Sequence, residues 1–514
     1  MKNAVRALIY LLPLVFVVLS CRGARADTNT STGTGALSAG TKATDDTADG
    51  YDALHATTTG VGNTAIGADT LSADTSGMSN TAVGYEALHA NTKGYQNVAV
   101  GDSALIVNTT GEDNVSVGSF SLFNNTTGNG NVALGNQALD SNTSGSGNTA
   151  VGYEVLANNT TGTLNASLGY QALYTNTTGD ANTGLGVTAL GNNTTGKGNT
   201  ATGADCLYSN TTAEDNTADG AEAMEYNKTG SDNTATGFEA LEDTTTGSNN
   251  LADGAGALLA NTTGEDNAAS GFGALFDNTT GDYNTASGYG VMNKNKTGDD
   301  NTADGAGALD ANVSGKSNIA VGYMAGADVT GSDNIEIGSM GTSSDADTMR
   351  LGTQGTQTKT YIAGIYGKTA ASGVAVYIDS KGQLGTLTSS AKFKRNIHDM
   401  GSVSDALMAL RPVTFQYKSD IDPTGTPQFG LIAEEVEKVN PDLVAHDENN
   451  RIYTVRYEAV NAMLLNEFQK QHQTIVAQEK TIAAQQLHAQ EQDQLLRSLA
   501  SRLDQLEQAE AKSR

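Results

Sequence analysis

The sequence predicts a mainly β protein: a parallel β-solenoid of 17-residue coils that is trimeric, then a small α+β domain and a C-terminal coiled coil. Three observations predict this fold class. An Asn recurs every 17 residues, sixteen times without interruption, from Asn63 to Asn318. The composition changes at Ser389 from Gly-, Thr- and Asn-rich to mixed charges with ordinary hydrophobic residues. Residues 463–514 carry a heptad pattern. A strict repeat of this length indicates one structural unit stacked on copies of itself.

Each repeat is predicted to be one coil, because 17 residues are too few for a pair of helices. The coil that begins at Asn80 reads Asn-Thr-Ala-Val-Gly, then Glu-Ala-Leu, and closes at Gly94. The Asn-Thr-Ala-Val and Glu-Ala-Leu stretches are predicted strands, and the Asn-Thr-Thr-Gly runs are predicted turns. We expect the recurring Asn side chains to stack as a ladder. The Gly at the fifth position of every coil predicts a backbone angle or close approach that no side chain tolerates.

The fourth position of the repeat divides the solenoid into two halves. It is apolar in the first eight coils and polar in the next seven, whereas the third position stays small. Because side chains alternate along a strand, one column faces the interior of the coil and the other faces a partner chain or water. We expect apolar contact between chains along the first half and a wetter second half. The fourth-position residues are Ile66, Val83, Val100, Val117, Leu134, Val151, Leu168, Leu185, Thr202, Asp219, Thr236, Asp253, Ser270, Ser287, Asp304 and Val321.

The N-terminus predicts export. Lys2 and Arg6 precede an apolar run over residues 7–19, which is typical of a signal peptide spanning residues 1–26. Two processing sites remain open: an ordinary cut after Ala26, or a lipobox-like cut that leaves a lipidated Cys21. No later segment is predicted to cross a membrane. The net charge of −28 argues against nucleic acid or an anionic membrane as partner. Cys206 replaces a small buried residue and is predicted to be structural.

Beyond the repeats, the pattern changes twice. Residues 334–388 contain strand-like runs at 349–351, 360–365 and 374–378, which predict a β-rich stem ending in a turn at 379–382. Residues 429–439 predict an amphipathic helix that stops before Asn440-Pro441. The heptad predicts a parallel trimeric coiled coil with polar layers, although heptads alone do not separate two strands from three, and a lone amphipathic helix is the alternative. Its two columns are Phe468, Ile475, Ile482, Ala489, Leu496, Leu503 and Leu464, Gln471, Gln478, Gln485, Gln492, Leu499, Leu506.

Four ordered motifs follow the composition change. They are Thr-Ser-Ser-Ala-Lys-Phe-Lys-Arg-Asn-Ile at 388–397, Arg-Pro-Val-Thr-Phe-Gln-Tyr at 411–417, Phe-Gly-Leu-Ile-Ala-Glu-Glu-Val at 429–436 and Tyr-Thr-Val-Arg-Tyr-Glu-Ala-Val at 453–460. Together they resemble the endosialidase-type intramolecular chaperone, the self-cleaving C-terminal domain of phage tail spikes and related surface fibres. The resemblance covers about residues 389–490. It implies a trimerising chaperone that assists folding of the preceding β-rich part and then cuts itself off.

The resemblance implies a Ser-Lys dyad. Carried over residue by residue, Ser389 is the nucleophile, Lys394 the base, and Thr388–Ser389 the scissile bond. This chemistry needs a neutral amine, so burial would have to depress the pKa of Lys394. Residues five apart meet neither on a strand nor on a helix, so a bend or a partner chain must join them. Ser390 remains an alternative nucleophile, the oxyanion-hole donors stay unidentified, and Asn396 and His398 are predicted surface residues.

The remaining signals are weaker. The repeats resemble, more loosely, the trimeric β-roll heads of autotransporter adhesins. The acidic turns at 112–113, 265–266 and 299–300 are predicted to be solvated, with Ca²⁺ binding as the alternative, and neither a metal nor another cofactor is predicted. The Asn-Thr-Thr triplets are formal glycosylation acceptors but are predicted to be turn residues.

Taken together, the patterns predict an exported homotrimeric surface fibre or adhesin, with a host-surface glycan or protein as its possible ligand. The alternatives are a polysaccharide-active or a purely structural solenoid. The only catalysis predicted is the self-cleavage. The predicted segments are a signal peptide (1–26), a flexible lead-in (27–50), solenoid repeats (51–333), a β-rich stem (334–388), a self-cleaving chaperone domain (389–462) and a coiled coil (463–514).

Overall fold

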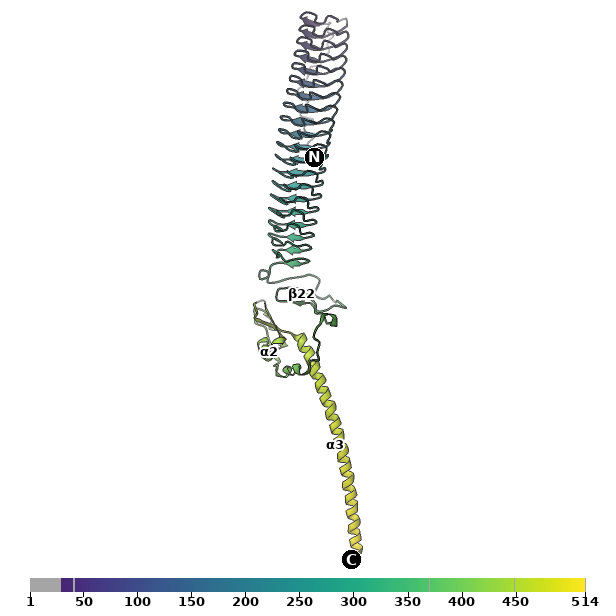
Figure 1. Ribbon diagram of the computed structural model, residues 1–514, viewed down its shortest axis with the longest axis vertical. Helices are drawn as coiled ribbons and strands as arrows, with labels where there is room; N and C mark the ends of the chain where they lie inside the picture. Colours follow the sequence, from purple (N-terminus) through teal and green to yellow (C-terminus); the bar gives the residue numbers. More distant parts are fainter. Residues whose placement is uncertain (1–28, 40–41, 369, 448, 514) are drawn as a thin grey trace. The chain divides into compact units, whose positions relative to one another are not determined.

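The computed structural model describes residues 29–39, 42–368, 370–447 and 449–513 (Figure 1). The chain divides between Thr358 and Lys359 into two compact units, which are described separately. The predicted signal peptide and Cys21 lie outside the described residues.

The first unit is a parallel β-solenoid, which confirms the predicted fold class. One short strand from each coil joins a single twenty-stranded parallel sheet, each strand pairing with the strand of the next coil. The strands are β1 (Thr30–Thr32), β2 (Thr47–Asp49), β3 (Thr64–Ile66), β4 (Thr81–Val83), β5 (Val98–Val100), β6 (Val115–Val117), β7 (Val132–Leu134), β8 (Thr149–Val151), β9 (Ala166–Leu168), β10 (Thr183–Leu185), β11 (Thr200–Thr202), β12 (Thr217–Asp219), β13 (Thr234–Thr236), β14 (Leu251–Asp253), β15 (Ala268–Ser270), β16 (Thr285–Ser287), β17 (Thr302–Asp304), β18 (Ile319–Val321), β19 (Ile335–Ile337) and β20 (Met349–Leu351).

The register pairs each repeat position with the same position of the next coil. Ala82 pairs with Ala99, and Val83 with Val100, so each repeat position forms a column along the solenoid. The third-position Ala82 is fully buried, whereas the fourth-position Leu168 is 53% exposed. The predicted division into an inner and an outer column is therefore confirmed. The inner Ala column and the ninth-position Leu column form one continuous apolar core.

The prediction of a second strand at Glu-Ala-Leu was wrong. In the coil of β4 this stretch is a turn, with φ of 54° at Glu86 and 53° at Leu88. Strands do not use this left-handed region, and most side chains avoid it. The turn nevertheless binds both neighbouring coils, since the Glu86 N–H donates to the Ala68 carbonyl at 3.0 Å and the Leu88 N–H to the Ala104 carbonyl at 2.9 Å. These bonds and the burial of Leu88 offset the conformational cost.

The fifth-position glycines meet the predicted requirement. Gly84 has a φ of 140°, and a Cβ placed on it would lie 2.2 Å from the Gly101 carbonyl oxygen of the next coil. Any side chain at this position would therefore separate the coils.

The predicted Asn ladder is present. The Asn80 Nδ2 donates to Asn63 Oδ1 at 3.2 Å, and the Asn80 backbone N–H donates to the same oxygen at 3.0 Å. The same amide also donates to the carbonyl of Gly94 at 2.9 Å, the residue that closes its coil. Because these Asn side chains are fully buried, the ladder satisfies polar groups that would otherwise be costly inside the solenoid.

A second Asn ladder was missed by the sequence analysis. It uses the Asn of the Asn-Thr-Thr-Gly turns: Asn108 Nδ2 donates to Asn91 Oδ1 and to the Gly111 carbonyl, both at 3.0 Å. The first ladder reaches the same carbonyl through Asn97, at 2.9 Å. The second-ladder Asn side chains are fully buried, so these formal glycosylation acceptors are inaccessible in the folded coil.

The sheet extends beyond the predicted repeat boundaries at both ends. β1 and β2 lie within the segment predicted as a flexible lead-in, and they pair in register with the coils that follow. At the other end, Ile319 pairs with Ile335 and Ile335 with Met349, so the last coils shorten to 16 and 14 residues.

In the predicted stem, residues 360–365 form no strand. The predicted run at 349–351 is β20 of the solenoid sheet. Among the other described residues of this segment, β21 (Tyr377–Ile378) and β22 (Leu384–Gly385) pair as an antiparallel hairpin. Its turn closes at Gly382, whose N–H donates to the Asp379 carbonyl at 3.1 Å, as the predicted turn at 379–382 requires.

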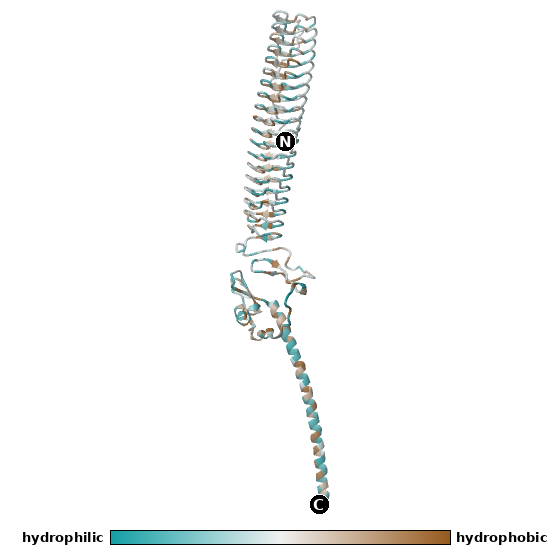
Figure 2. Ribbon diagram, viewed as in Figure 1, coloured by the Kyte–Doolittle hydropathy of each residue, from teal (hydrophilic) through white to brown (hydrophobic). Residues whose placement is uncertain are grey.

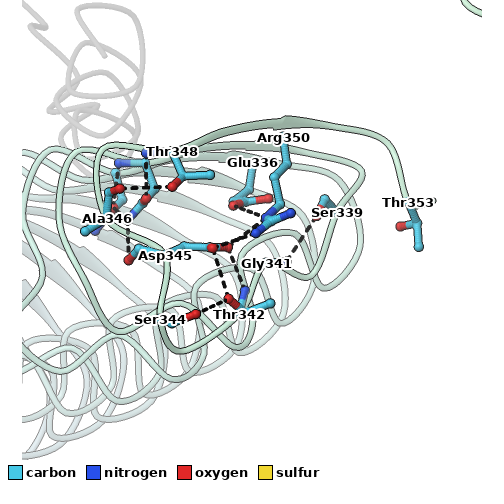
Figure 3. A network of polar contacts seen from close by, with 12 residues as sticks. Glu336, Ser339, Gly341, Thr342, Ser344, Asp345, Ala346, Thr348, Arg350 and Thr353 are labelled. Atoms are coloured by element: carbon cyan, nitrogen blue, oxygen red, sulfur yellow. Dashed lines mark hydrogen bonds and ion pairs between the residues drawn. The ribbon is translucent and has the colours of Figure 1, made fainter. Parts of the chain in front are cut away.

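A polar cluster closes the C-terminal end of the solenoid core (Figure 3). Glu336 occupies the buried third position that Ala320 fills one coil earlier, and Arg350 pairs with it in register. The guanidinium of Arg350 lies 3.8 Å from Glu336 and forms two hydrogen bonds to Asp345, at 2.8 and 2.6 Å. The hydrogen bond from Arg350 lowers the pKa of Asp345 to about 2, whereas burial raises the pKa of Glu336. The apolar core therefore ends in charged groups, as terminal repeats require for solubility.

The second unit ends in a small α+β domain and a long helix. Its elements pack around one core formed by Val436, Leu443, Val444, Val455, Val460 and Met463. Among the described residues, no helix combines the length and apolarity needed to cross a membrane. The elements are η2 (Ala391–Phe393), η3 (Gly401–Ala409), β23 (Val413–Phe415), β24 (Gln428–Gly430), α2 (Ala433–Val439), η4 (Pro441–Leu443), β25 (Val444–His446), β26 (Ile452–Val455) and α3 (Tyr457–Ser513).

The helix predicted over 429–439 is shorter than expected. Residues 428–430 belong to β24, and α2 begins only at Ala433. The helix ends at Val439, before Asn440-Pro441, as predicted. The apolar pattern of 429–432 suits an antiparallel partner for β23 equally well, so short-range pattern alone did not separate strand from helix.

Candidate functional site

A short 3₁₀ turn brings Ser389 and Lys394 together. In η2 the Phe393 N–H donates to the Ser390 carbonyl, and the Lys394 N–H to the Ala391 carbonyl, both at 3.0 Å. This turn reverses the chain so that Lys394 Nζ lies 3.1 Å from Ser389 Oγ. The bend that the five-residue spacing demands is thus supplied within one chain.

The dyad is open to solvent in a single chain. Thr388, Ser389 and Lys394 are all exposed, as are the neighbouring apolar side chains of Phe393 and Ile397, at 60% and 65%. The ammonium of Lys392 lies 4.7 Å from the centre of the Phe393 ring. The burial that would favour a neutral amine at Lys394 is therefore not provided by one chain alone.

The other residues considered for this site lie apart from the dyad contact. Ser390 precedes η2, and its side chain forms no capping hydrogen bond there. Asn396 has a left-handed φ of 55°, typical of an Asn in a turn. His398 is exposed. No hydrogen bond among the described residues joins Asn396 or His398 to Ser389.

The later sequence motifs meet around one small fold. β23 and β24 pair antiparallel, with Val413 opposite Gly430. The guanidinium of Arg411 holds Glu435 of α2 by hydrogen bonds of 2.6 and 3.0 Å. The Leu431 N–H donates to the Tyr457 hydroxyl at 3.0 Å, which ties the end of β24 to the start of α3. The motifs at 411–417, 429–436 and 453–460 are thus parts of one structural unit.

A buried polar cluster that the sequence analysis missed anchors α3. Ser404 of η3 is fully buried, and its hydroxyl donates to Glu467 of α3. Lys470 Nζ lies 2.6 Å from Glu467 and 2.5 Å from Asp405. The hydrogen bond from Lys470 is the main cause that lowers the pKa of Glu467. The spacing of Glu467 and Lys470, three residues apart on one helix face, was the available sequence signal.

The acidic turns considered for Ca²⁺ have ordinary turn geometry. Asp113, Asp266 and Asp300 adopt left-handed φ values of 56–59° in exposed turns. Among the described residues, the carboxylates close enough to share a cation are those of Glu222, Glu225 and Glu242. Burial, followed by repulsion from nearby carboxylates, raises the pKa of Glu242 to about 7. A bound proton can therefore relieve this cluster without a metal.

The comparison with known families agrees with the predicted resemblance. A family model described as chaperone of endosialidase matches residues 389–445, a span that begins at Ser389 and includes Lys394, β23, β24 and α2. No curated protein matches the chain. The chain therefore joins a parallel β-solenoid to a segment similar to the chaperone of endosialidase, an arrangement that fits a tail-fibre-like protein.

Proposed function

We propose that this protein is an exported homotrimeric surface fibre or adhesin whose C-terminal domain drives trimer assembly and then releases itself. The cut falls at Thr388–Ser389. The observation that carries this proposal is the 3.1 Å contact between Lys394 Nζ and Ser389 Oγ at the first residue of the family match.

The position of the scissile bond defines the chemistry. Neutral Lys394 takes the hydroxyl proton of Ser389, and the Oγ attacks the carbonyl carbon of Thr388. The Thr388–Ser389 C–N bond breaks as an ester forms, and the Ser389 nitrogen takes the proton from the Lys394 ammonium. Water then hydrolyses the ester, which leaves a carboxylate on Thr388 and restores the Ser389 hydroxyl. No cofactor enters this scheme.

Assembly supplies the environment that one chain lacks. Hydrophobic residues recur among hydrophilic ones along α3 (Figure 2). Apolar side chains on this helix are exposed, including Phe468 at 71%, Ile475 at 51% and Ile482 at 52%. Phe429 and Tyr453 of the chaperone-like domain are 82% and 76% exposed. Trimerisation through α3 buries these surfaces and encloses the dyad, so that cleavage follows assembly.

Intact-mass measurement of the purified full-length chain tests the cleavage. The unchanged protein yields a fragment that begins at Ser389. Ser389→Ala and Lys394→Arg remain uncut, because Ala has no hydroxyl and Arg stays protonated. The matched controls Ser390→Ala and Lys392→Arg cleave normally. Cleavage of Ser389→Ala at the same bond contradicts the proposal.

The link between cleavage and assembly needs a second set of variants. Changing Phe468, Ile475 and Ile482 together to Asp gives an uncut monomer, detected by native mass measurement. Efficient cleavage in that monomer separates catalysis from assembly and overturns this part of the proposal.

A further inference from the structure

An open groove lies on the second half of the solenoid. It has a volume of about 560 Å³ and spans the coils that begin at Asn267, Asn284, Asn301 and Asn318. Phe272, Tyr289 and Tyr323, at the sixth repeat position, line the groove together with Phe276, Asn293 and Asp310, at the tenth.

Three successive glycines at the seventh repeat position, Gly273, Gly290 and Gly307, line the groove. In the first eleven coils this position always carries a side chain, for example Glu154 or Gln171. Those residues adopt φ of 55° and 52°, close to the 58° of Gly290, so the backbone does not require glycine here. A Cβ on Gly290 would meet nothing within 4 Å. Gly273 and Gly290 therefore open space rather than relieve strain, whereas a Cβ on Gly307 would lie 2.6 Å from Met324 Sδ.

The sixth-position column of the groove has no aromatic ring between Tyr289 and Tyr323. The Phe272 and Tyr289 rings stack at 5.5 Å, with an angle of 10° between their planes. The next coil has Ala306 in this column, and Tyr323 follows, 81% exposed. Two strand spacings of ~4.8 Å separate Tyr289 from Tyr323, so a six-membered ring between them would lie about 4.8 Å from each.

The polar groups of the groove narrow the ligand class. The N–H groups of Gly290 and Gly307 already donate to the carbonyls of Phe272 and Tyr289, at 2.9 and 3.0 Å. These two N–H groups are therefore not available to pair with the backbone of an extended peptide ligand. Asp310 forms an ion pair with Lys294 at 2.8 Å. Because this ion pair offsets the negative charge of Asp310, the groove is less suited to an organic cation.

We propose that this groove binds a neutral oligosaccharide. The apolar face of a pyranose ring packs between aromatic rings, while its hydroxyls bind Asp310, Asn293 and Asp277 at the groove. The carboxylates and the net charge of −28 disfavour acidic sugars. This inference rests on the proposed role as a surface fibre or adhesin and names its ligand class.

Titration calorimetry with cellohexaose, maltohexaose and mannohexaose tests the groove, with an oligogalacturonate as the acidic comparison. At least one neutral hexaose binds the full-length protein. Tyr289→Ala and Gly290→Gln weaken that binding at least tenfold. Gln is chosen because Gln171 occupies the same repeat position with a similar φ. The matched control is Tyr170→Ala, which breaks an equivalent stack with Tyr153, at 5.5 Å and 9°, beside side-chain-bearing seventh positions.

Several outcomes overturn the inference. The first two are that no neutral hexaose binds, or that Gly290→Gln leaves the affinity unchanged. The others are that Tyr170→Ala weakens binding as much as Tyr289→Ala does, or that the oligogalacturonate binds more tightly than the neutral hexaoses. Dissociation of the trimer by Tyr289→Ala would make the groove an interface between copies instead. Cleavage at Ser389 and trimer mass, measured on the same samples, keep failure of this inference distinct from failure of the proposed assembly.

Discussion

Asp74 stands at a position where later coils place a ladder Asn. Its side chain is fully buried; Oδ1 accepts hydrogen bonds from the Gly77 N–H at 2.9 Å and from Asn91 Nδ2 at 3.1 Å. Its Oδ2 has no partner among the described residues. Burial raises the pKa of Asp74 from 3.8 to about 7, against the opposing effect of these hydrogen bonds.

The raised pKa predicts a stability that falls with rising pH. The folded state holds the proton more tightly, so the contribution is full below pH 3.8 and is lost as pH rises to about 7. Asp74→Asn should raise the free energy of unfolding of the N-terminal coils at pH 8 by about 2–4 kcal/mol, since each pKa unit corresponds to about 1.4 kcal/mol. Amide hydrogen exchange at pH 5 and pH 8, corrected for intrinsic rates, measures this difference.

The exposed Asp102 provides the matched control. Asp102→Asn should leave the pH dependence of the same coils unchanged. If the Asp74→Asn variant keeps the full pH dependence of stability, a group other than Asp74 causes that dependence.

Sequence reasoning succeeded where one residue type served one role. The unbroken column from Asn63 to Asn318 predicted the first ladder, and the fifth-position Gly predicted the close approach between coils. The second ladder was not predicted, because Asn is also common in turns and because Thr244 interrupts the column of ladder Asn residues. For the dyad, spacing required a bend between Ser389 and Lys394, but the 3₁₀ turn itself follows from no pattern in those residues.

At the scale of elements, left-handed residues explain the error in the coil. Leu88 and its equivalents have strong strand-like patterning, and sequence alone does not reveal that inter-coil hydrogen bonds hold them at positive φ. The same limit applies to 360–365, where apolar residues are 60–87% exposed at Tyr361, Ile362 and Ile365 instead of forming a strand. Strand propensity reports a fit to a sheet, and no strand of the described residues pairs with this segment.

The polar cluster at the end of the solenoid gives an element-scale prediction. Arg350→Ala leaves the buried Glu336 and Asp345 without their cation, and should destabilise the last coils by about 2 kcal/mol. Glu336→Ala places the usual third-position residue in the core and should be neutral or stabilising. Limited proteolysis and hydrogen exchange across residues 319–351 measure both effects. Equal destabilisation by the two variants would show that Glu336 itself supports the fold.

At the scale of the whole molecule, the outer column distinguishes the two halves of the solenoid. Ile66, Leu134 and Leu168 are 41%, 37% and 53% exposed in a single chain, an unusual density of apolar side chains for a solvated sheet face. The second half places Asp219, Asp253 and Asp304 in the same column. We expect the first half to supply the apolar contact between chains, because its outer column is apolar in eight successive coils.

Variants in this column test that division. Val100→Asp and Leu134→Asp together bury charges at the expected interface, which should cost several kcal/mol and weaken the trimer at least a hundredfold. Asp253→Val, in the same column of the wetter half, should leave the trimer intact. Sedimentation equilibrium of the full-length chain measures the trimer stability of these variants. Every sample also carries Ser389→Ala, so that the C-terminal domain is not lost by cleavage. Because α3 is also proposed to hold the chains together, the solenoid contacts are resolved best when Ile475→Asp weakens the helix contact in all samples. If the trimer is then as stable in the Val100→Asp, Leu134→Asp double variant as in Asp253→Val, the outer column does not set the contact between chains.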